Sequence, residues 1–205
     1  MAVDDRIFQT SRAVAYRLAR SQIRNGDILL GHGRALFSRA IQAATRSPWS
    51  HVAFIWKLDA IDRILVLESV ETFGVRAISL STKINGGSTG RPYRGDLLVA
   101  RHRDFESLID DAAMSRRTAF AVDRLGCRYD PGEVIQIVAR IMAGSLRLPV
   151  ENRHRAGNTY VCSEYAAECY QAIGIEIPWN RRGFISPADF AADPKVDPVM
   201  VLKPG

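Results

Sequence analysis

Long apolar runs, cysteines and lysines are all scarce in this sequence, and each shortage excludes a class of protein. No run of about 18 apolar residues occurs, so no transmembrane helix is predicted. The first 24 residues hold two aspartates among several arginines and no apolar core, which is unlike a secretory signal peptide, so we expect a cytoplasmic protein. Three cysteines, an odd number in a chain without a signal, argue against a disulfide framework.

Lysine is scarce because arginine supplies most of the positive charge. Of the 28 basic residues only 4 are lysines, and the net charge is +6. An arginine excess is compatible with binding of nucleic acid or phosphate. The arginines are spread along the chain, however, and no basic stripe interleaved with aromatic residues is present. We therefore attribute the excess to general composition and expect no nucleic-acid partner.

The chain has the length and composition of one globular domain, with 205 residues, 47% hydrophobic and 24% charged. Residues 4–24 are predicted to form a loosely amphipathic, arginine-rich helix. We therefore expect an N-terminal helical extension over residues 1–25 and a main domain over residues 26–205. The extension is expected to pack across the sheet or to contact a partner or an anionic surface, such as the face of a membrane.

Apolar periodicity predicts strands in the first half of the chain and helices mostly in the second. The predicted strands are 28–30, 51–57, 64–70, 74–80 and 96–101, of which the second and third form a hairpin. The predicted helices are 37–44, 106–126, 132–146 and 161–173, and a last short helix begins at Ser186-Pro187. Gly31-His32-Gly33 is interpreted as a turn, and residues 149–158 as a polar loop. The fold class is therefore α+β, with an antiparallel sheet packed against helices.

Cys162 stands at the predicted start of a helix. A thiol in the first turn lies at the positive end of the helix dipole, which lowers its pKa, and the free N–H groups there can bind an oxyanion. A free cysteine is more often a small buried hydrophobe, so Cys162 alone leaves both interpretations open. Cys169 lies about 10 Å further along the same helix, too far for a disulfide, and we interpret it and Cys127 as structural.

His51 and Glu68 are predicted to lie on the same face of the hairpin. His51 opens its first strand, and Glu68 lies inside the apolar run of the second, where a carboxylate is costly to bury without a partner. If the hairpin turns near Asp59-Ala60, the two residues are directly opposite; a shift of one residue makes them diagonal neighbours. In either register Glu68 can fix the tautomer of the imidazole, as the third member of a catalytic triad does. A structural ion pair is the alternative.

Four short motifs follow one another along the chain: Gly26-Asp27-Ile28-Leu29, Ser50-His51-Val52-Ala53-Phe54, Leu67-Glu68-Ser69 followed by Gly74-Val75-Arg76, and Tyr160-Val161-Cys162-Ser163-Glu164-Tyr165. In this order they resemble the permuted papain-like amidases, which are relatives of NlpC-type cell-wall peptidases and of lecithin:retinol acyltransferase. Most papain-like enzymes place the cysteine helix before the histidine strand, whereas the permuted group has histidine, acidic residue and cysteine in the order seen here. The resemblance covers roughly residues 26–190.

The resemblance implies a circularly permuted papain-like fold and a cysteine hydrolase. Cys162 would be the nucleophile, His51 its base and Glu68 the residue that orients the base, with no cofactor and no metal. The substrate would contain an amide bond (peptide, isopeptide or lipid amide) or an ester. The family also places a tyrosine near the site, for which Tyr129 and Tyr160 are both candidates.

Other interpretations of the same residues were considered. Gly86-Gly87-Ser88-Thr89-Gly90 fits the G-x-S-x-G pattern of serine hydrolases but lacks the strand before it and the helix after it that this motif requires. A zinc site from His51, Cys162 and Cys169 lacks a closely spaced ligand pair. An acyltransferase, or a non-catalytic protein that binds an acidic ligand on the same fold, stays an alternative to the hydrolase.

Overall fold

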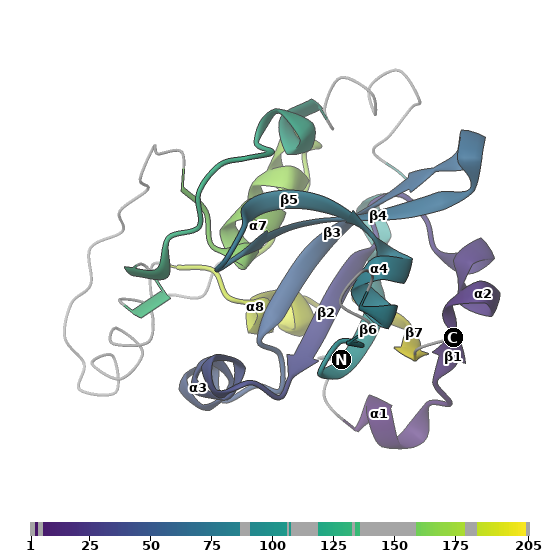
Figure 1. Cartoon of the computed structure of the whole chain (residues 1–205), viewed down its shortest axis with the longest axis horizontal. Helices are drawn as coiled ribbons and strands as arrows, with labels where there is room; N and C mark the ends of the chain where they lie inside the picture. The colour runs from purple at the N-terminus through teal and green to yellow at the C-terminus, as the bar shows by residue number, and fades with distance from the viewer. Residues whose placement is uncertain are drawn as a thin grey trace.

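One seven-stranded sheet organises the fold, in the order β1-β7-β6-β2-β3-β4-β5 (Figure 1). The computed structural model describes residues 3, 6–86, 91–105, 107, 119–132, 134–135, 159–178 and 184–203. All neighbouring strands are antiparallel except β1 and β7, which are parallel. The strands are β1 (Val14–Ala15), β2 (Ile28–Gly33), β3 (His51–Leu58), β4 (Arg63–Val70), β5 (Gly74–Ser79), β6 (Gly95–His102) and β7 (Val196–Lys203).

Short helices accompany the sheet, and one longer helix, α7, packs against β3 and β4. Residues 119–123 and parts of 131–135 are also helical. Residues 107 and 124–126, which the sequence placed in the helix 106–126, are turns; the rest of the predicted helices 106–126 and 132–146 and the predicted loop 149–158 lie outside the described residues. The helices are α1 (Ile7–Thr10), α2 (Tyr16–Ala19), η1 (Arg20–Gln22), α3 (Leu36–Thr45), η2 (Asp59–Ile61), α4 (Leu80–Asn85), η4 (Arg103–Phe105), α7 (Cys162–Ala172) and α8 (Pro187–Ala192).

Both faces of the central strands are buried. Val52 and Phe54 of β3 belong to the apolar cluster that includes side chains of α7 and α8. Ala53 and Ile55 point to the opposite face and belong to the cluster that includes side chains of α2 and α4. A strand buried on both faces needs apolar residues at consecutive positions, which explains why this segment has no polar alternation in the sequence.

The N-terminal segment differs from the single helix predicted over residues 4–24, so that prediction is wrong. The described part forms α1, β1, α2 and η1 instead, and β1 adds to the edge of the sheet by pairing Val14 with Leu202. Tyr16, Ala19 and Ile23 are buried against the sheet, and their spacing of three and four residues imitates one face of a helix. The apolar periodicity therefore reflects burial, but these residues are buried against the sheet and do not form one face of a single helix. The boundary between residues 25 and 26 stays a prediction.

The predicted turn at residues 31–33 is also wrong, because β2 continues through it. Gly31 pairs with both His51 of β3 and Leu97 of β6. A Cβ at Gly31 would lie 2.8 Å from the hydroxyl of Tyr93 and 3.2 Å from the Cβ of His51. The close approach of Tyr93 and of His51 on β3 therefore favours glycine here, and the sequence does not distinguish such a glycine from one in a turn.

Strand β7 was not predicted from the sequence, and β5 ends one residue earlier than predicted. Pro198 lies inside β7, and proline disfavours a central strand. A bulge accommodates it, since the pairing of β7 with β6 shifts between Val99 and Ala100. β5 ends at Ser79 because the hydroxyl of Ser79 accepts a hydrogen bond from the backbone N–H of Thr82 (3.1 Å) and so caps α4.

Candidate active site

Strands β3 and β4 bring His51 and Glu68 together. The last paired residues at this end of the two strands are Phe54 and Leu67. Extending that register makes His51 and Glu68 diagonal neighbours on one face, as expected when the hairpin turn lies one residue beyond Asp59-Ala60. The Nε2 atom of His51 lies 2.8 Å from Oε2 of Glu68. This contact leaves Nδ1 as the ring nitrogen available to another partner.

Glu68 carries a charge in a buried position and is surrounded by cations. Its side chain is 0% exposed. Oε1 accepts hydrogen bonds from Nε (3.0 Å) and Nη2 (2.7 Å) of Arg76, and Oε2 accepts one from Nζ of Lys83 (2.5 Å). Burial alone raises the pKa of Glu68, but the charge of Lys83 and the contact with His51 outweigh burial and hold this pKa well below 4.5. Glu68 is therefore ionised and held at both oxygens.

The thiol of Cys162 lies against His51 at the N-terminus of α7. It makes a hydrogen bond with the imidazole and is close to the backbone N–H groups of Val52 and Ser163. Burial raises the pKa of this thiol. The imidazole and the two N–H groups lower the pKa by more than burial raises it, so the net pKa lies below 9.0. Burial and Lys83 lower the pKa of His51, and its contacts with Cys162 and Glu68 raise it by more. Both shifts favour a thiolate beside an imidazolium.

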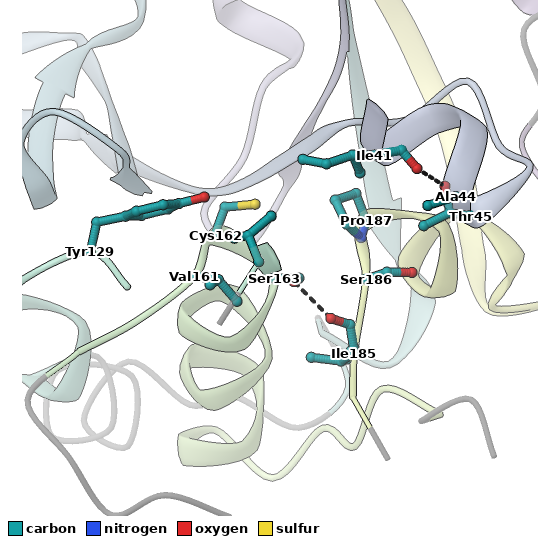
Figure 2. Close-up of a pocket in the computed structure, with 11 residues that line it drawn as sticks. Ile41, Ala44, Thr45, Tyr129, Val161, Cys162, Ser163, Ile185, Ser186 and Pro187 are labelled. Carbon is teal, nitrogen blue, oxygen red and sulfur yellow. Dashed lines mark hydrogen bonds between the residues drawn. The ribbon is translucent and has the colours of Figure 1, made fainter. Parts of the chain in front are cut away.

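Hydrogen bonds from three directions fix the segment that carries Cys162. The hydroxyl of Ser69, near the end of β4, donates to the carbonyl of Tyr160 (2.6 Å). The backbone N–H of Tyr160 donates to the carbonyl of Arg128 (2.9 Å). The hydroxyl of Ser163 donates to the carbonyl of Ile185 (2.8 Å), a contact drawn in Figure 2. The start of α7 is thus held against β4 and the C-terminal segment, which presents the thiol to His51.

A pocket with mainly apolar walls opens beside Cys162 (Figure 2). Its volume is about 380 Å³ including the space open to solvent. Helix α3 forms one wall through Ile41, Ala44 and Thr45. The lining residues are Ile41, Ala44, Thr45, Tyr129, Val134, Val161, Cys162, Ser163, Ile185, Ser186 and Pro187.

The two candidate tyrosines have different surroundings. Tyr129 lines the pocket, and its hydroxyl points toward Cys162 (Figure 2). Tyr160 is 6% exposed, packs edge-on against the ring of Tyr165, and its hydroxyl bonds to Arg124 and Glu168. The geometry therefore places Tyr129 at the site and Tyr160 in the core beside it, while a substrate-binding role for either one stays a prediction.

Three residues of the site were not assigned a role from the sequence: Arg76, Lys83 and Tyr93. Arg76 lies opposite Glu68 on β5 and had a signal, because it belongs to a motif of the family resemblance. Lys83 and Tyr93 had none. They come from α4 and from the segment before β6, and the Lys83 ammonium lies 5.3 Å from the centre of the Tyr93 ring. The packing of α4 against β4 brings Lys83 to the site.

The other two cysteines lie outside this arrangement. Cys169 is buried, and burial gives its thiol a raised pKa, whereas the net pKa shift of Cys162, two turns earlier, is downward. Cys127 is half-buried and free. Among the described residues no group of three or more His, Cys, Asp or Glu side chains is arranged to hold a metal ion. The described helices also include none that is long and apolar enough to cross a membrane.

A sheet whose histidine strand precedes the cysteine helix along the chain defines a circularly permuted papain-like protein. The chain matches the family of permuted papain-like amidase enzymes, YaeF/YiiX, C92 family, over residues 22–142, and it belongs to this family. The matched range contains His51 and Glu68 and ends before Cys162. Membership supports a hydrolase-type function of the amidase or peptidase kind. The predicted family and α+β fold are thereby confirmed.

A solved structure has a similar fold. The metalloprotein YiiX from Escherichia coli O157:H7 is 21% identical, with a TM-score of 0.58 over 89% of this chain and 99% of that chain. At this identity the likeness concerns the fold. No curated protein is detectably similar to the chain.

Proposed function

We propose that the protein is a cysteine hydrolase that cleaves an amide or ester bond through a thioacyl intermediate. The observation that carries the proposal is the hydrogen-bonded series from Cys162 through His51 to Glu68, with a lowered thiol pKa in a buried position. At Cys169, on the same helix, burial dominates and the pKa of the thiol is raised. A nucleophile requires a lowered pKa, whereas a cysteine that only fills space does not.

In the first half of the proposed reaction, the Cys162 sulfur attacks the substrate carbonyl carbon. The proton of the thiol resides on Nδ1 of His51, and Glu68 at Nε2 stabilises the imidazolium that results. Helix α7 begins at Cys162, and the N–H groups of the first turn of a helix lack intrahelical acceptors, so they can bind the developing oxyanion. When the carbonyl re-forms, the bond to the amine or alcohol breaks, and His51 gives that leaving group its proton.

In the second half, water releases the acyl group. His51 is now neutral and removes a proton from the water as its oxygen attacks the thioester carbon. The carbon–sulfur bond then breaks, a carboxylic acid leaves, and the proton on His51 restores the thiolate–imidazolium pair. An acyltransferase would follow the same course with an alcohol or amine in place of water.

The pocket beside the thiol favours a substrate with an apolar acyl group. Ile41, Val134, Val161, Ile185 and Pro187 supply carbon surface to its walls. Burying each methylene of an acyl chain contributes about 0.8 kcal/mol, so a longer chain should bind and react better until the pocket is full. The Tyr129 hydroxyl, which points toward the thiol, is placed to contact the polar carbonyl end.

The proposal is tested with p-nitrophenyl esters and anilides whose acyl chains increase in length from acetyl. We expect kcat/KM to rise with each added methylene, by up to about fourfold per step. Mass spectrometry of rapidly quenched reactions should show one acyl group on the peptide that contains Cys162. Cys162→Ala should abolish both signals, whereas the matched variant Cys169→Ala should retain them.

Alkylation provides a readout that does not depend on the choice of substrate. Iodoacetamide at about pH 6 should label Cys162 before Cys169, and His51→Ala should slow the labelling because the thiolate loses its partner. Equal labelling of both cysteines, unaffected by His51→Ala, would refute the enzyme and leave a binding protein. An acyl-enzyme that accumulates until an alcohol or amine is added would instead identify an acyltransferase.

A further inference from the structure

Glu68 is bound to more cations than orientation of His51 requires. Oε1 is held by Arg76, so only Oε2 faces the imidazole, and the same Oε2 atom also accepts from Nζ of Lys83. The Lys83 side chain is 9% exposed, against 28% for Arg76. A buried ammonium that contacts the same Glu68 oxygen as the imidazole holds the carboxylate in place and also changes the balance of charge around His51.

We propose that Lys83, through its charge at the Glu68 oxygen that faces His51, limits the pH up to which His51 retains its proton. The inference rests on the proposed function, because it assigns a regulatory role within the Cys162–His51–Glu68 site. Lys83 does not contact the reacting atoms and acts through Glu68 and His51.

The position of Lys83 is determined by the packing of α4. Leu80 and Ile84 are buried against the sheet, and the helical period places Lys83 on the same face. Tyr93 covers the ammonium from the side, at 5.3 Å from the ring centre. The carboxylate of Glu68 is therefore clamped between two elements, with Arg76 of β5 on one oxygen and Lys83 of α4 on the other.

The charge of Lys83 opposes the retention of a proton by His51. An ammonium at the carboxylate oxygen that faces the imidazole partly neutralises the attraction of Glu68 for an imidazolium. After burial, Lys83 is the largest influence that lowers the pKa of His51, whereas Cys162 and Glu68 raise it. The charged or titratable groups around His51 are Lys83 of α4, Cys162 of α7, Glu68 of β4, Arg76 of β5 acting through Glu68, and Tyr93 before β6.

This balance matters most for release of the acyl group. While the thioester exists, Cys162 carries no negative charge, so Glu68 and Lys83 become the main opposing charges that act on His51. Water is activated only by unprotonated His51. Without the charge of Lys83, His51 should hold its proton to higher pH, and hydrolysis of the thioester should require more alkaline solution.

The experiment compares wild type with Lys83→Gln, which keeps a hydrogen-bond donor and removes the charge. NMR of the imidazole Cε1–H, assigned with His51→Ala, measures the pKa of His51, and pre-steady-state kinetics measures deacylation against pH. We expect the His51 titration and the deacylation midpoint both to move to higher pH. Lys83→Arg should return both toward wild type, and Lys195→Gln, which removes a surface lysine paired with Asp104, should leave both unchanged.

A purely structural role for Lys83 would give a different result. Loss of the clamp would then free Glu68 from His51, and the imidazole would titrate at lower pH than in wild type. That result, or no shift at all, would overturn the inference, and Lys83→Met provides a second variant if Lys83→Gln does not fold. The His51 titration needs no turnover, so it separates failure of this inference from failure of the hydrolase proposal, which the His51 dependence of Cys162 alkylation tests.

Discussion

Glu68→Gln is the substitution that tests most directly how the buried charges are balanced. It preserves the shape of the side chain and removes the negative charge shared by Arg76, Lys83 and His51. Removing one partner of a buried ion pair typically costs about 3–5 kcal/mol, because the other charge remains buried. Arg76 is 28% exposed and can recover some hydration, whereas Lys83 at 9% cannot. We therefore expect a loss of about 3 kcal/mol, near the lower limit of that range.

Urea unfolding measures this loss. With an m value of about 2 kcal/mol per molar, a destabilisation of about 3 kcal/mol lowers the urea midpoint by about 1.5 M. Glu71→Gln is the matched control, since Glu71 is exposed in the turn after β4 and the same change there should shift stability by less than about 0.5 kcal/mol.

A double substitution identifies the cause of the loss. In Glu68→Gln/Lys83→Met the unpaired ammonium is removed together with the carboxylate, so the double variant should be more stable than Glu68→Gln alone by about 1 kcal/mol or more. If Glu68→Gln unfolds within about 0.5 kcal/mol of wild type, or if Lys83→Met makes it less stable still, the buried ion pairs do not contribute as described.

Three further outcomes are expected. The pKa of Glu68 in the folded protein lies below 4.5, so its contribution to stability is complete above that pH. This contribution is lost as the pH falls toward the folded pKa, by up to about 1.4 kcal/mol per pH unit. Between about pH 5 and pH 3, the free energy of unfolding measured in urea should therefore decline less steeply in Glu68→Gln than in wild type. Gly31→Ala should displace the Tyr93 hydroxyl, which would lie 2.8 Å from the new Cβ, and should slow alkylation of the Cys162 thiol while the protein stays folded. An unchanged alkylation rate would show that the contact between Gly31 and Tyr93 does not affect the site. Ile23→Ala, at a 0% exposed position of the N-terminal segment, should cost about 2–5 kcal/mol in thermal or urea unfolding, while Leu18→Ala, at 70%, should cost less than about 0.5 kcal/mol; equal effects would contradict the packing of that segment.

Strands β3 to β6 and the His51–Glu68 contact were predictable because both depend on short-range pattern. Alternation and hairpin spacing constrain which residues share a face, and either register of the turn brought these two side chains together. The prediction for the N-terminal segment was wrong because its structure depends on long-range pairing. Its buried residues follow a helical period, yet Val14 pairs with Leu202, at the other end of the chain, and no local pattern encodes that pairing.

The residues around Glu68 show the same limit within the site. Arg76 was within reach of a sequence argument because it lies on the strand next to Glu68. Lys83 was not, since a lysine in a short helix is normally solvated, and only the docking of Leu80 and Ile84 turns it inward.

The sequence by itself determined the order of strands β3 to β6 and helix α7, the α+β class and the identity of Cys162, His51 and Glu68 as candidates, because residue types and local periods carry that information. The tertiary structure alone decided that the thiol of Cys162 meets His51, that Tyr129 rather than Tyr160 lines the pocket, and that Lys83 shares an oxygen of Glu68 with the imidazole. These contacts join α7, β3, β4 and α4 across long separations in sequence. Burial then sets the electrostatics, since the same charges exposed to water would interact weakly, whereas at 0% exposure of Glu68 they shift the pKa values on which the proposed chemistry depends.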